Sequence, residues 1–278
     1  MMPTVAVAGG SNQEILELAK RSQTEFDQRV NFIVYDTEPN IDQENTWQYI
    51  KCDTVEEMVR QTVECAANKT ADILLKGGVQ THALLKEVLK AEHGLRMQGV
   101  LSHVALVNLP ALDRQIILTD AGMNIAPTED QLVQIIENGI MVGKSIGLSH
   151  PKVALLSAAE NFNPKMPSSV ISKQLTERFK DSTEATVYGP LSLDLAVSKS
   201  AVEHKGFKGP IEGDADILVV PNIDVGNVLY KSFLLFGHAT MGGTVVGTKV
   251  PIVLTSRSDE VKSKLYALKF AMMQLADK

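Results

Sequence analysis

The segment DADILVVPNIDVGNVLYK, Asp214 to Lys231, contains a complete transition from a buried strand to a helix. Its short β-branched run ends at Pro221 and Asn222, and the residues from Gly226 onward carry apolar side chains at helical spacing. Ligands of open α/β folds bind where polar groups gather at the carboxyl ends of strands, which makes Asn222 a candidate binding residue. The alternative, with equal weight, is that this segment is only an Asx turn and a helix cap, with Lys231 on a solvated surface.

The same alternation of short strands and longer helices extends in both directions from this segment. The predicted strands are 4–8, 31–35, 71–75, 105–109, 115–119, 152–156, 185–188, 216–220 and 251–255. The predicted helices are 13–19, 55–67, 83–92, 129–146, 168–179, 226–235 and 258–275. Strands 105–109 and 115–119 are joined by a short turn with a proline, which predicts an antiparallel hairpin. The pattern predicts an α/β protein, and nine strands favour two α/β lobes over one sheet with short connections.

Composition and charge exclude several classes of protein. The 278 residues carry 27 Lys and Arg against 33 Asp and Glu, and a net charge of −6 argues against a nucleic-acid surface. The apolar runs are far shorter than the roughly 18 residues of a membrane helix, so no membrane partner is expected. Cys52 and Cys65 form neither a disulfide framework nor a zinc pattern, which favours a reducing cytoplasm.

Glycine-rich turns are the main chemical signal in the chain. They are AGGS at 8–11, KGG at 76–78, DAGMN at 120–124, YGP at 188–190, DVGN at 224–227 and GGTVVGT at 242–248. Each is expected at a strand end or helix start, where backbone N–H groups can approach an anion. None matches a complete Walker A or dinucleotide motif, and any one alone is explained by a tight turn. Together they favour a phosphate-bearing ligand, with Lys76, Gly77, Asp120 and Asn124 as candidate binding residues.

A second polar segment, TSRSDE at 255–260, lies between a predicted strand and a predicted helix. The guanidinium of Arg257 beside free helix N–H groups suits a phosphate or an acyl phosphate. Asp259 or Glu260 could accept a proton nearby, although a helix cap with a surface arginine is the simpler reading of this segment alone.

The histidines offer no metal site, since neither HxH nor HExxH spacing occurs. His103, which follows Ser102 beside a strand, could polarise a bound group. A buried structural histidine is the alternative at this position.

Long stretches of the chain resemble the phosphotransacylase family, specifically its phosphate butyryltransferase branch. The matching stretches are LLKGGVQTHALLKEVL, VLSHVALVNLP, ILTDAGMNIAPT, NPKMPSSV, YGPLSLDLAVS, HKGFKGPIEGDADILVVPNIDVGNVLYKS and VVGTKVPIVLTSRSDE. The resemblance implies two α/β lobes similar to isopropylmalate dehydrogenases, with the active site in the cleft between them, and a homodimer. The lobes are expected at 1–105 plus 244–278 and at 106–243.

The resemblance also implies reversible transfer of a short or branched acyl group between coenzyme A and inorganic phosphate. No bound cofactor, metal or covalent acyl-enzyme is expected, because coenzyme A thioester and phosphate are both substrates. A base takes the thiol proton, the thiolate attacks the acyl-phosphate carbonyl, and phosphate leaves. Ser256 is expected to donate to the oxyanion or the thiol, Arg257 to bind the phosphoryl group, and Asp259, with Glu260 beside it, to be the candidate base.

Further site residues come from the same resemblance. The family's GN-x-x-YK run, a wall of the cleft, falls on Gly226, Asn227, Tyr230 and Lys231. Arg96 lies near a family arginine that contacts the nucleotide end of coenzyme A. Acetyl-specific relatives often carry a cysteine after the aspartate that matches Asp120, and Ala121 stands there in this chain.

Two other functions remain open at the level of sequence. One is a metal- and nicotinamide-dependent dehydrogenase of the related fold, for which only Asp214 and Asp216 approach the required cluster of acids. The other is a non-catalytic module that binds acyl-CoA, against which the retained Ser256 and Arg257 argue.

Overall fold

The computed structural model describes residues 2–26, 29–97, 99–254 and 261–275. The chain divides into two compact units, which we call unit 1 (Met1–Gly99 with Gly242–Lys278) and unit 2 (Val100–Met241). The lobe boundaries expected from the sequence, after residues 105 and 243, lie six and two residues later than these two unit boundaries. None of the described helices combines the length and hydropathy needed to cross a membrane.

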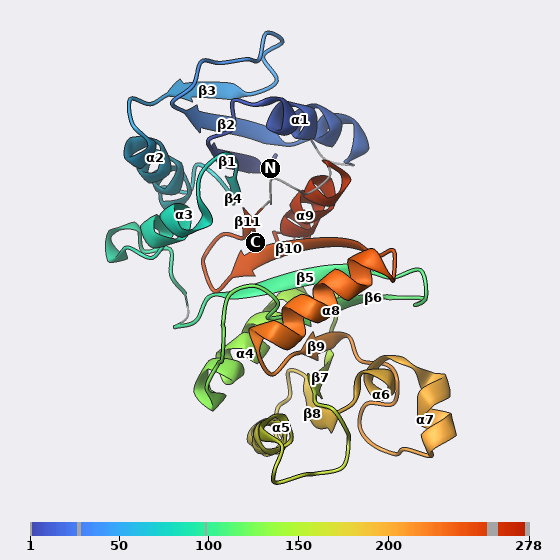
Figure 1. The fold of residues 1–278 in the computed structure, drawn as a ribbon. Coiled ribbons are helices and arrows are strands. Elements are labelled where there is room, and N and C mark those ends of the chain that lie inside the picture. Colours follow the sequence, from blue (N-terminus) through green and yellow to red (C-terminus); the bar gives the residue numbers. More distant parts are fainter. Residues whose placement is uncertain (1, 27–28, 98, 255–260, 276–278) are drawn as a thin grey trace. The chain divides into compact units, whose positions relative to one another are not determined.

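Unit 1 is built on a largely parallel sheet (Figure 1). Its strands are β1 (Thr4–Ala8), β2 (Asn31–Asp36), β3 (Gln48–Lys51), β4 (Ile73–Lys76), β10 (Thr240–Val246) and β11 (Ile252–Leu254), in the order β3-β2-β1-β4-β11-β10. Strand β10 belongs to unit 1 from Gly242 onward. All neighbours are parallel except β10 and β11, which are antiparallel. Helices α1 (Gln13–Glu25) and α9 (Val261–Met273) cover one face, and α2 (Val55–Ala67), α3 (Thr81–Val88) and the 3-10 turn η1 (Ala91–His93) cover the other.

The core of unit 1 joins segments that are far apart in the sequence. Val5, Val7 and Ile73 from the strands pack against Leu18 of α1 and Leu268 of α9, all of them fully buried. The helices start where the sequence provides hydrogen-bonding caps, since Asn12 accepts from the N–H of Ile15 and Thr54 from that of Glu57.

The strands of unit 2 lie in the order β5-β6-β9-β7-β8. Its strands are β5 (Ser102–Asn108), β6 (Gln115–Thr119), β7 (Lys152–Leu156), β8 (Thr186–Leu191) and β9 (Ile217–Val219). Its helices are α4 (Glu129–Ser145), α5 (Pro167–Arg178), α6 (Leu193–Val197), α7 (Lys199–Lys205) and α8 (Ile223–Leu235). β5 and β6 form the predicted antiparallel hairpin, and the other neighbours are parallel. Thr128 and Gln131 form a reciprocal capping box at the start of α4.

Two of the predicted glycine-rich turns, 188–190 and most of 242–248, lie in strands instead. Gly189 lies within β8 and Gly242 within β10. A Cβ on Gly242 would lie 2.4 Å from the backbone N of Ala267, and one on Gly189 would lie 2.6 Å from the Cβ of Leu155. Glycine is required at both positions by close packing inside the unit, and not by a turn that receives an anion.

Four elements were not predicted from the sequence: β3, β10, α6 and α7. β3 is short and polar, with the sequence QYIK and two exposed ends, so its residues carry little apolar patterning. α6 and α7 have five and seven residues, too few for helical periodicity to become visible.

Candidate active site

Asp120 organises the turn that follows β6. The side chain is 3% exposed, and its Oδ1 accepts hydrogen bonds from the N–H groups of Gly122 (2.9 Å) and Met123 (3.0 Å). Its Oδ2 accepts from the backbone N of Asn124 (3.3 Å) and from Nδ2 of the same residue (2.6 Å). Nδ2 of Asn124 also donates to the carbonyl of Leu101, which fixes the turn to the residue before β5. The carboxylate therefore holds the DAGMN turn in shape and is already saturated with donors.

Helix α8 packs directly against this turn. A Cβ on Gly226 would lie 2.7 Å from the carbonyl oxygen of Asp120, so only glycine permits this approach. Nδ2 of Asn227 donates to the carbonyl of Ala121 at 3.5 Å. Asn222 caps the helix, since its Oδ1 accepts from the N–H of Val225 at 3.0 Å. Asn222 is therefore a helix cap, which was one of the two interpretations of this segment. Gly226 and Asn227 hold the helix against the Asp120 turn.

His103 lies on β5 beside the same turn. Its half-buried ring meets the ring of Tyr230 edge-on, with 6.1 Å between centroids and 68° between planes. Nδ1 is buried without a hydrogen-bond partner among the described residues. Burial lowers the pKa of the imidazole, and the negative charge of Asp120 opposes that shift. His103 is therefore a neutral imidazole near pH 7 with an unused ring nitrogen.

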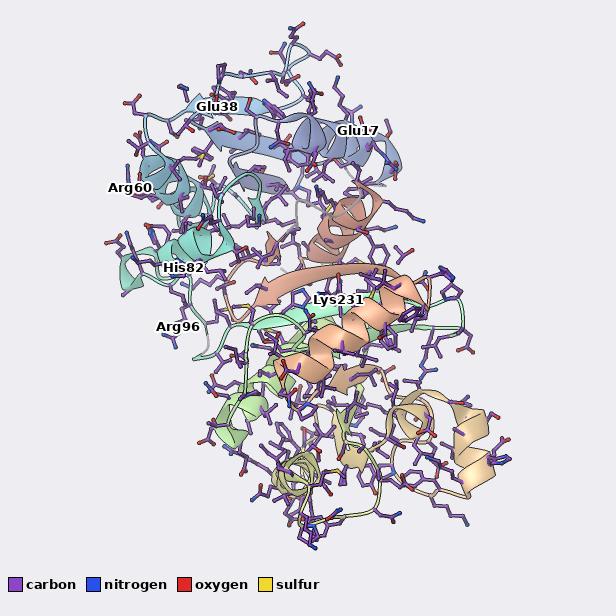
Figure 2. All side chains as sticks on the ribbon, in the orientation of Figure 1. Glu17, Glu38, Arg60, His82, Arg96 and Lys231 are labelled. Atoms are coloured by element: carbon purple, nitrogen blue, oxygen red, sulfur yellow. The ribbon has the colours of Figure 1, made fainter. Side chains whose placement is uncertain are left out.

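Ser102 does not share a site with His103. Its hydroxyl is fully buried and accepts a hydrogen bond from Nδ2 of Asn138, on α4, at 2.9 Å. Successive side chains of a strand point to opposite faces, so Ser102 faces α4 while His103 faces α8. Lys231, which belongs to the GN-x-x-YK run together with Tyr230, is exposed on α8 (Figure 2).

Three predicted binding residues belong to unit 1. Lys76 ends β4 and is 8% exposed, and its Nζ lies 3.3 Å from the carbonyl oxygens of both Gly77 and Val79. A Cβ on Gly77 would lie 2.2 Å from the carbonyl oxygen of Gly9, so the turns after β4 and β1 touch through backbone alone. Arg96 forms an isolated antiparallel bridge with Thr248, and its guanidinium donates to the carbonyl of Gly99 (Figure 2).

The three residues expected to carry the chemistry, Ser256, Arg257 and Asp259, lie outside the described residues, as does Glu260. The structure thus brings together six predicted residues in unit 2 around one turn: His103, Asp120, Asn124, Gly226, Asn227 and Tyr230.

One group of potential metal ligands occurs among the described residues. Single ligand atoms of Glu87, Glu92 and His93 lie within 4.8 Å of one another. The ammonium of Lys90 lies 2.8 Å from Glu87 and 3.8 Å from Glu92, and Nε2 of His93 lies 2.8 Å from Glu87, so both acids already have cationic or hydrogen-bonding partners. The arrangement is that of an ion-pair network.

Sequence reasoning missed two polar residues that shape these regions. Asn138 lies on the apolar side of α4, and a polar residue at an apolar position was the available signal for a buried hydrogen bond to Ser102. Asp36 ends the apolar run of β2 and is 6% exposed, and an acid at the carboxyl end of a strand was the signal there.

Comparison with known proteins places this arrangement in a family. Residues 6–272 match the family described as "Phosphate acetyl/butaryl transferase". A probable phosphate butyryltransferase of Bacillus subtilis is 38% identical over 277 residues, which cover 97% of this chain and 92% of the relative. The crystal structure of a branched-chain phosphotransacylase from Enterococcus faecalis has 59% identity and a TM-score of 0.96, and the match covers 99% of each chain.

A more distant likeness concerns the fold alone. A 4-hydroxythreonine-4-phosphate dehydrogenase from Burkholderia phymatum has 15% identity and a TM-score of 0.58, with 99% of this chain and 98% of that chain covered. Dehydrogenases of the isocitrate and isopropylmalate type share this fold, which confirms the predicted fold class. Members of the matched family use acyl-CoA and phosphate as substrates. The resemblance seen in the sequence is confirmed, and the chain belongs to the phosphate acetyl/butyryl transferase family and is a phosphate acyltransferase.

Proposed function

We propose that the protein moves a butyryl or branched short acyl group reversibly between coenzyme A and inorganic phosphate. The observation that carries this choice of acyl group is the 59% identity, over 99% of both chains, to a branched-chain phosphotransacylase. Likeness to dehydrogenases is limited to the fold and lends no support to a nicotinamide-dependent reaction.

Three residues of the 255–260 segment are assigned the chemical steps. Asp259, with Glu260 as the alternative, takes the proton from the thiol of coenzyme A. The thiolate then attacks the carbonyl carbon of the acyl phosphate, and Ser256 donates a hydrogen bond to the oxygen that becomes negative. The bond between the carbonyl carbon and the phosphate oxygen breaks, and Arg257 holds the departing phosphate.

His103 is assigned a supporting role toward the substrate. A neutral imidazole whose Nδ1 carries the proton can donate a hydrogen bond to an acyl or phosphoryl oxygen without adding charge. Asp120 is a poor base because four donors already occupy its oxygens. The turn that it closes accepts a hydrogen bond from Asn227 and lies beside His103.

The ends of the coenzyme A molecule call for cationic partners. We assign Arg96 and Lys231 to its phosphate groups, since both side chains reach the surface of their units, and Lys76 to a structural role at the end of β4. Arg96→Ala is expected to raise KM for coenzyme A with kcat nearly unchanged, because phosphate contacts of this kind are made equally in the ground and transition states. A fall in kcat at unchanged KM would contradict the assignment.

The reaction is tested by phosphate-dependent release of the thiol from a series of acyl-CoA esters. We expect the highest kcat/KM with butyryl-, isobutyryl- or isovaleryl-CoA and a lower value with acetyl-CoA. Arg257→Ala is expected to lower kcat/KM by at least about 100-fold, as removal of a charged donor to the transition state does. Arg178→Ala is the matched control, because that arginine is exposed on α5 and pairs with Asp130. Folded protein that releases no thiol from any ester would refute the proposal.

The assembly and location of the protein are proposed from the family resemblance alone. We propose a homodimer in the cytoplasm. Light scattering is expected to give twice the mass of one chain at micromolar concentration, and a monomer would contradict this. Cell fractionation checks the location, and recovery with the membrane or secreted fraction would contradict it.

A further inference from the structure

A cavity of about 560 Å³ lies within unit 1 at the carboxyl ends of β2, β1 and β4. Its volume falls in the range of roughly 300–1,000 Å³ typical of small-molecule sites. Three turns and the first turns of α2 and α3 form its walls. Among the described residues that line it, none is assigned above to acyl transfer.

The topology of unit 1 makes this a favoured place for a ligand. The strand order β3-β2-β1-β4 means that the chain leaves β1 in one direction to reach β2 and crosses back past it to reach β4. Ligands of open α/β sheets bind in the crevice formed at such a reversal. The turns that follow β1 and β4 meet there, since the N–H of Gly78 donates to the carbonyl of Gly9, whose φ is +74°.

Asp36 supplies a fixed carboxylate at the polar end of the cavity. Its Oδ2 accepts from the N–H of Ser11 at 2.7 Å, and its Oδ1 accepts from the N–H of Glu38 at 3.0 Å. These bonds set the orientation of the carboxylate, and each oxygen keeps a further lone pair. The position, at the end of the strand after the first βα unit, is the one from which an acid binds ribose hydroxyls in nucleotide-binding folds.

The opposite wall is apolar and suits a flat ring. Val55 and Met58 come from the start of α2, and Val79 and Ala83 come from the turn before α3 and its first turn. Asp36 and Glu38 both line the cavity, and the negative charges of their carboxylates disfavour a phosphate beside them. The turn after β1, GGSNQ, also lacks the glycine spacing that receives a diphosphate.

We propose that unit 1 binds an uncharged ribonucleoside in this cavity, with a ribose hydroxyl donating to Asp36 and the base between the side chains of α2 and α3. This site is additional to the one at which acyl transfer takes place. A hydroxyl that donates to a carboxylate gives discrimination against a deoxyribose, and the apolar wall gives affinity for the base.

The experiment is calorimetric titration of the full-length protein with adenosine, alone and with saturating coenzyme A. We expect one adenosine per chain in both conditions. Either 2′-deoxyadenosine or 3′-deoxyadenosine is expected to bind at least tenfold more weakly. Because no turnover is measured, the outcome does not depend on whether the acyl-transfer proposal is correct.

Two variants locate the site. Asp36→Asn is expected to weaken adenosine binding at least tenfold, with Glu17→Gln, an exposed acid on α1, as the matched control (Figure 2). Ala83→Phe fills the apolar part without touching the bonds of Asp36 and is expected to abolish binding, with His82→Phe as the control on the exposed neighbour. Absence of binding to the parent protein, displacement by coenzyme A, or unchanged binding in folded Ala83→Phe would each overturn the proposal.

Discussion

His103 shows how one buried nitrogen can link the candidate active site to pH. Because burial lowers the pKa of its imidazole below the ordinary 6.5, the unfolded chain takes up a proton in mild acid that the folded chain does not. The stability contributed by this residue is therefore complete above the unfolded pKa and is lost as the pH falls toward the folded pKa. The urea midpoint is expected to fall more between pH 7.5 and 5.5 in the parent protein than in His103→Gln.

The comparison isolates His103 because every other titratable group is common to both proteins. Asp120 and Tyr230 are the groups that face the ring, and both remain in the variant. Equal pH dependence in the two proteins would mean that the imidazole is as easily protonated in the fold as outside it.

Gly77 is a residue at which packing leaves no room for a side chain. A methyl group there would meet the carbonyl oxygen of Gly9 at 2.2 Å, and the obstacle is backbone that cannot rotate away. Gly77→Ala is expected to lower the free energy of unfolding by about 1–3 kcal/mol, measured by urea denaturation.

Gly139 provides the matched control for that substitution. A Cβ at this position in α4 would be in ordinary contact with Ile217 at 3.5 Å and Thr119 at 3.6 Å. Gly139→Ala is expected to be neutral or to stabilise the protein by about 0.5–1 kcal/mol, because alanine favours a helix interior. A similar loss of stability in both variants would show that backbone clash is not the cause at Gly77.

At the scale of elements, α8 decides how the candidate site is held, and Asn222 is the residue that starts it. Asn222→Ala is expected to cost about 0.5–2 kcal/mol of stability, since the N–H of Val225 loses its acceptor. Asn222→Asp keeps an acceptor oxygen and is expected to retain both stability and acyl transfer. If Asn222 instead bound substrate through its amide N–H₂ group, the Asp variant would be stable and inactive, and thermal melting with thiol release separates the two cases.

Elements with strong periodicity could be predicted from the sequence, and those defined by tertiary packing could not. The helix predicted at 55–67 has the observed bounds of α2, and the hairpin of β5 and β6 has the predicted direction. The strand β10 was interpreted as a glycine loop. Gly242 is explained by the close approach of Ala267, a tertiary contact that the sequence does not reveal.

For the candidate site, the residues could be predicted from the sequence and their individual roles could not. Asp120, Gly226 and Asn227 were named from turn chemistry and family motifs, and the structure brings them together. Their individual tasks were not predictable, since whether an aspartate is a base or a closer of its own turn depends on hydrogen bonds within the folded chain.

At the scale of the whole molecule, unit 1 is assembled from both ends of the chain. β11 pairs with β4, and Val253, Leu265 and Leu268 complete the core around β1 and α1. A fragment of residues 1–99 would leave those apolar surfaces exposed, so we expect it to lack a cooperative unfolding transition by circular dichroism.

The same dependence predicts that the two ends can fold together without unit 2. The carbonyl of Gly247 accepts from the N–H of Met97, two residues before Gly99. Gly242 lies five residue steps before Gly247, roughly 17 Å along an extended chain, so Gly99 and Gly242 lie within about 30 Å of each other. A flexible linker of about 12 residues spans that distance, and residues 1–99 joined in this way to 242–278 are expected to unfold cooperatively. Leu268→Asp in the joined fragment is expected to abolish the transition, because it buries an unpaired charge at a fully buried position. Cooperative folding of 1–99 alone would show instead that the N-terminal strands need no contribution from the C-terminal segment.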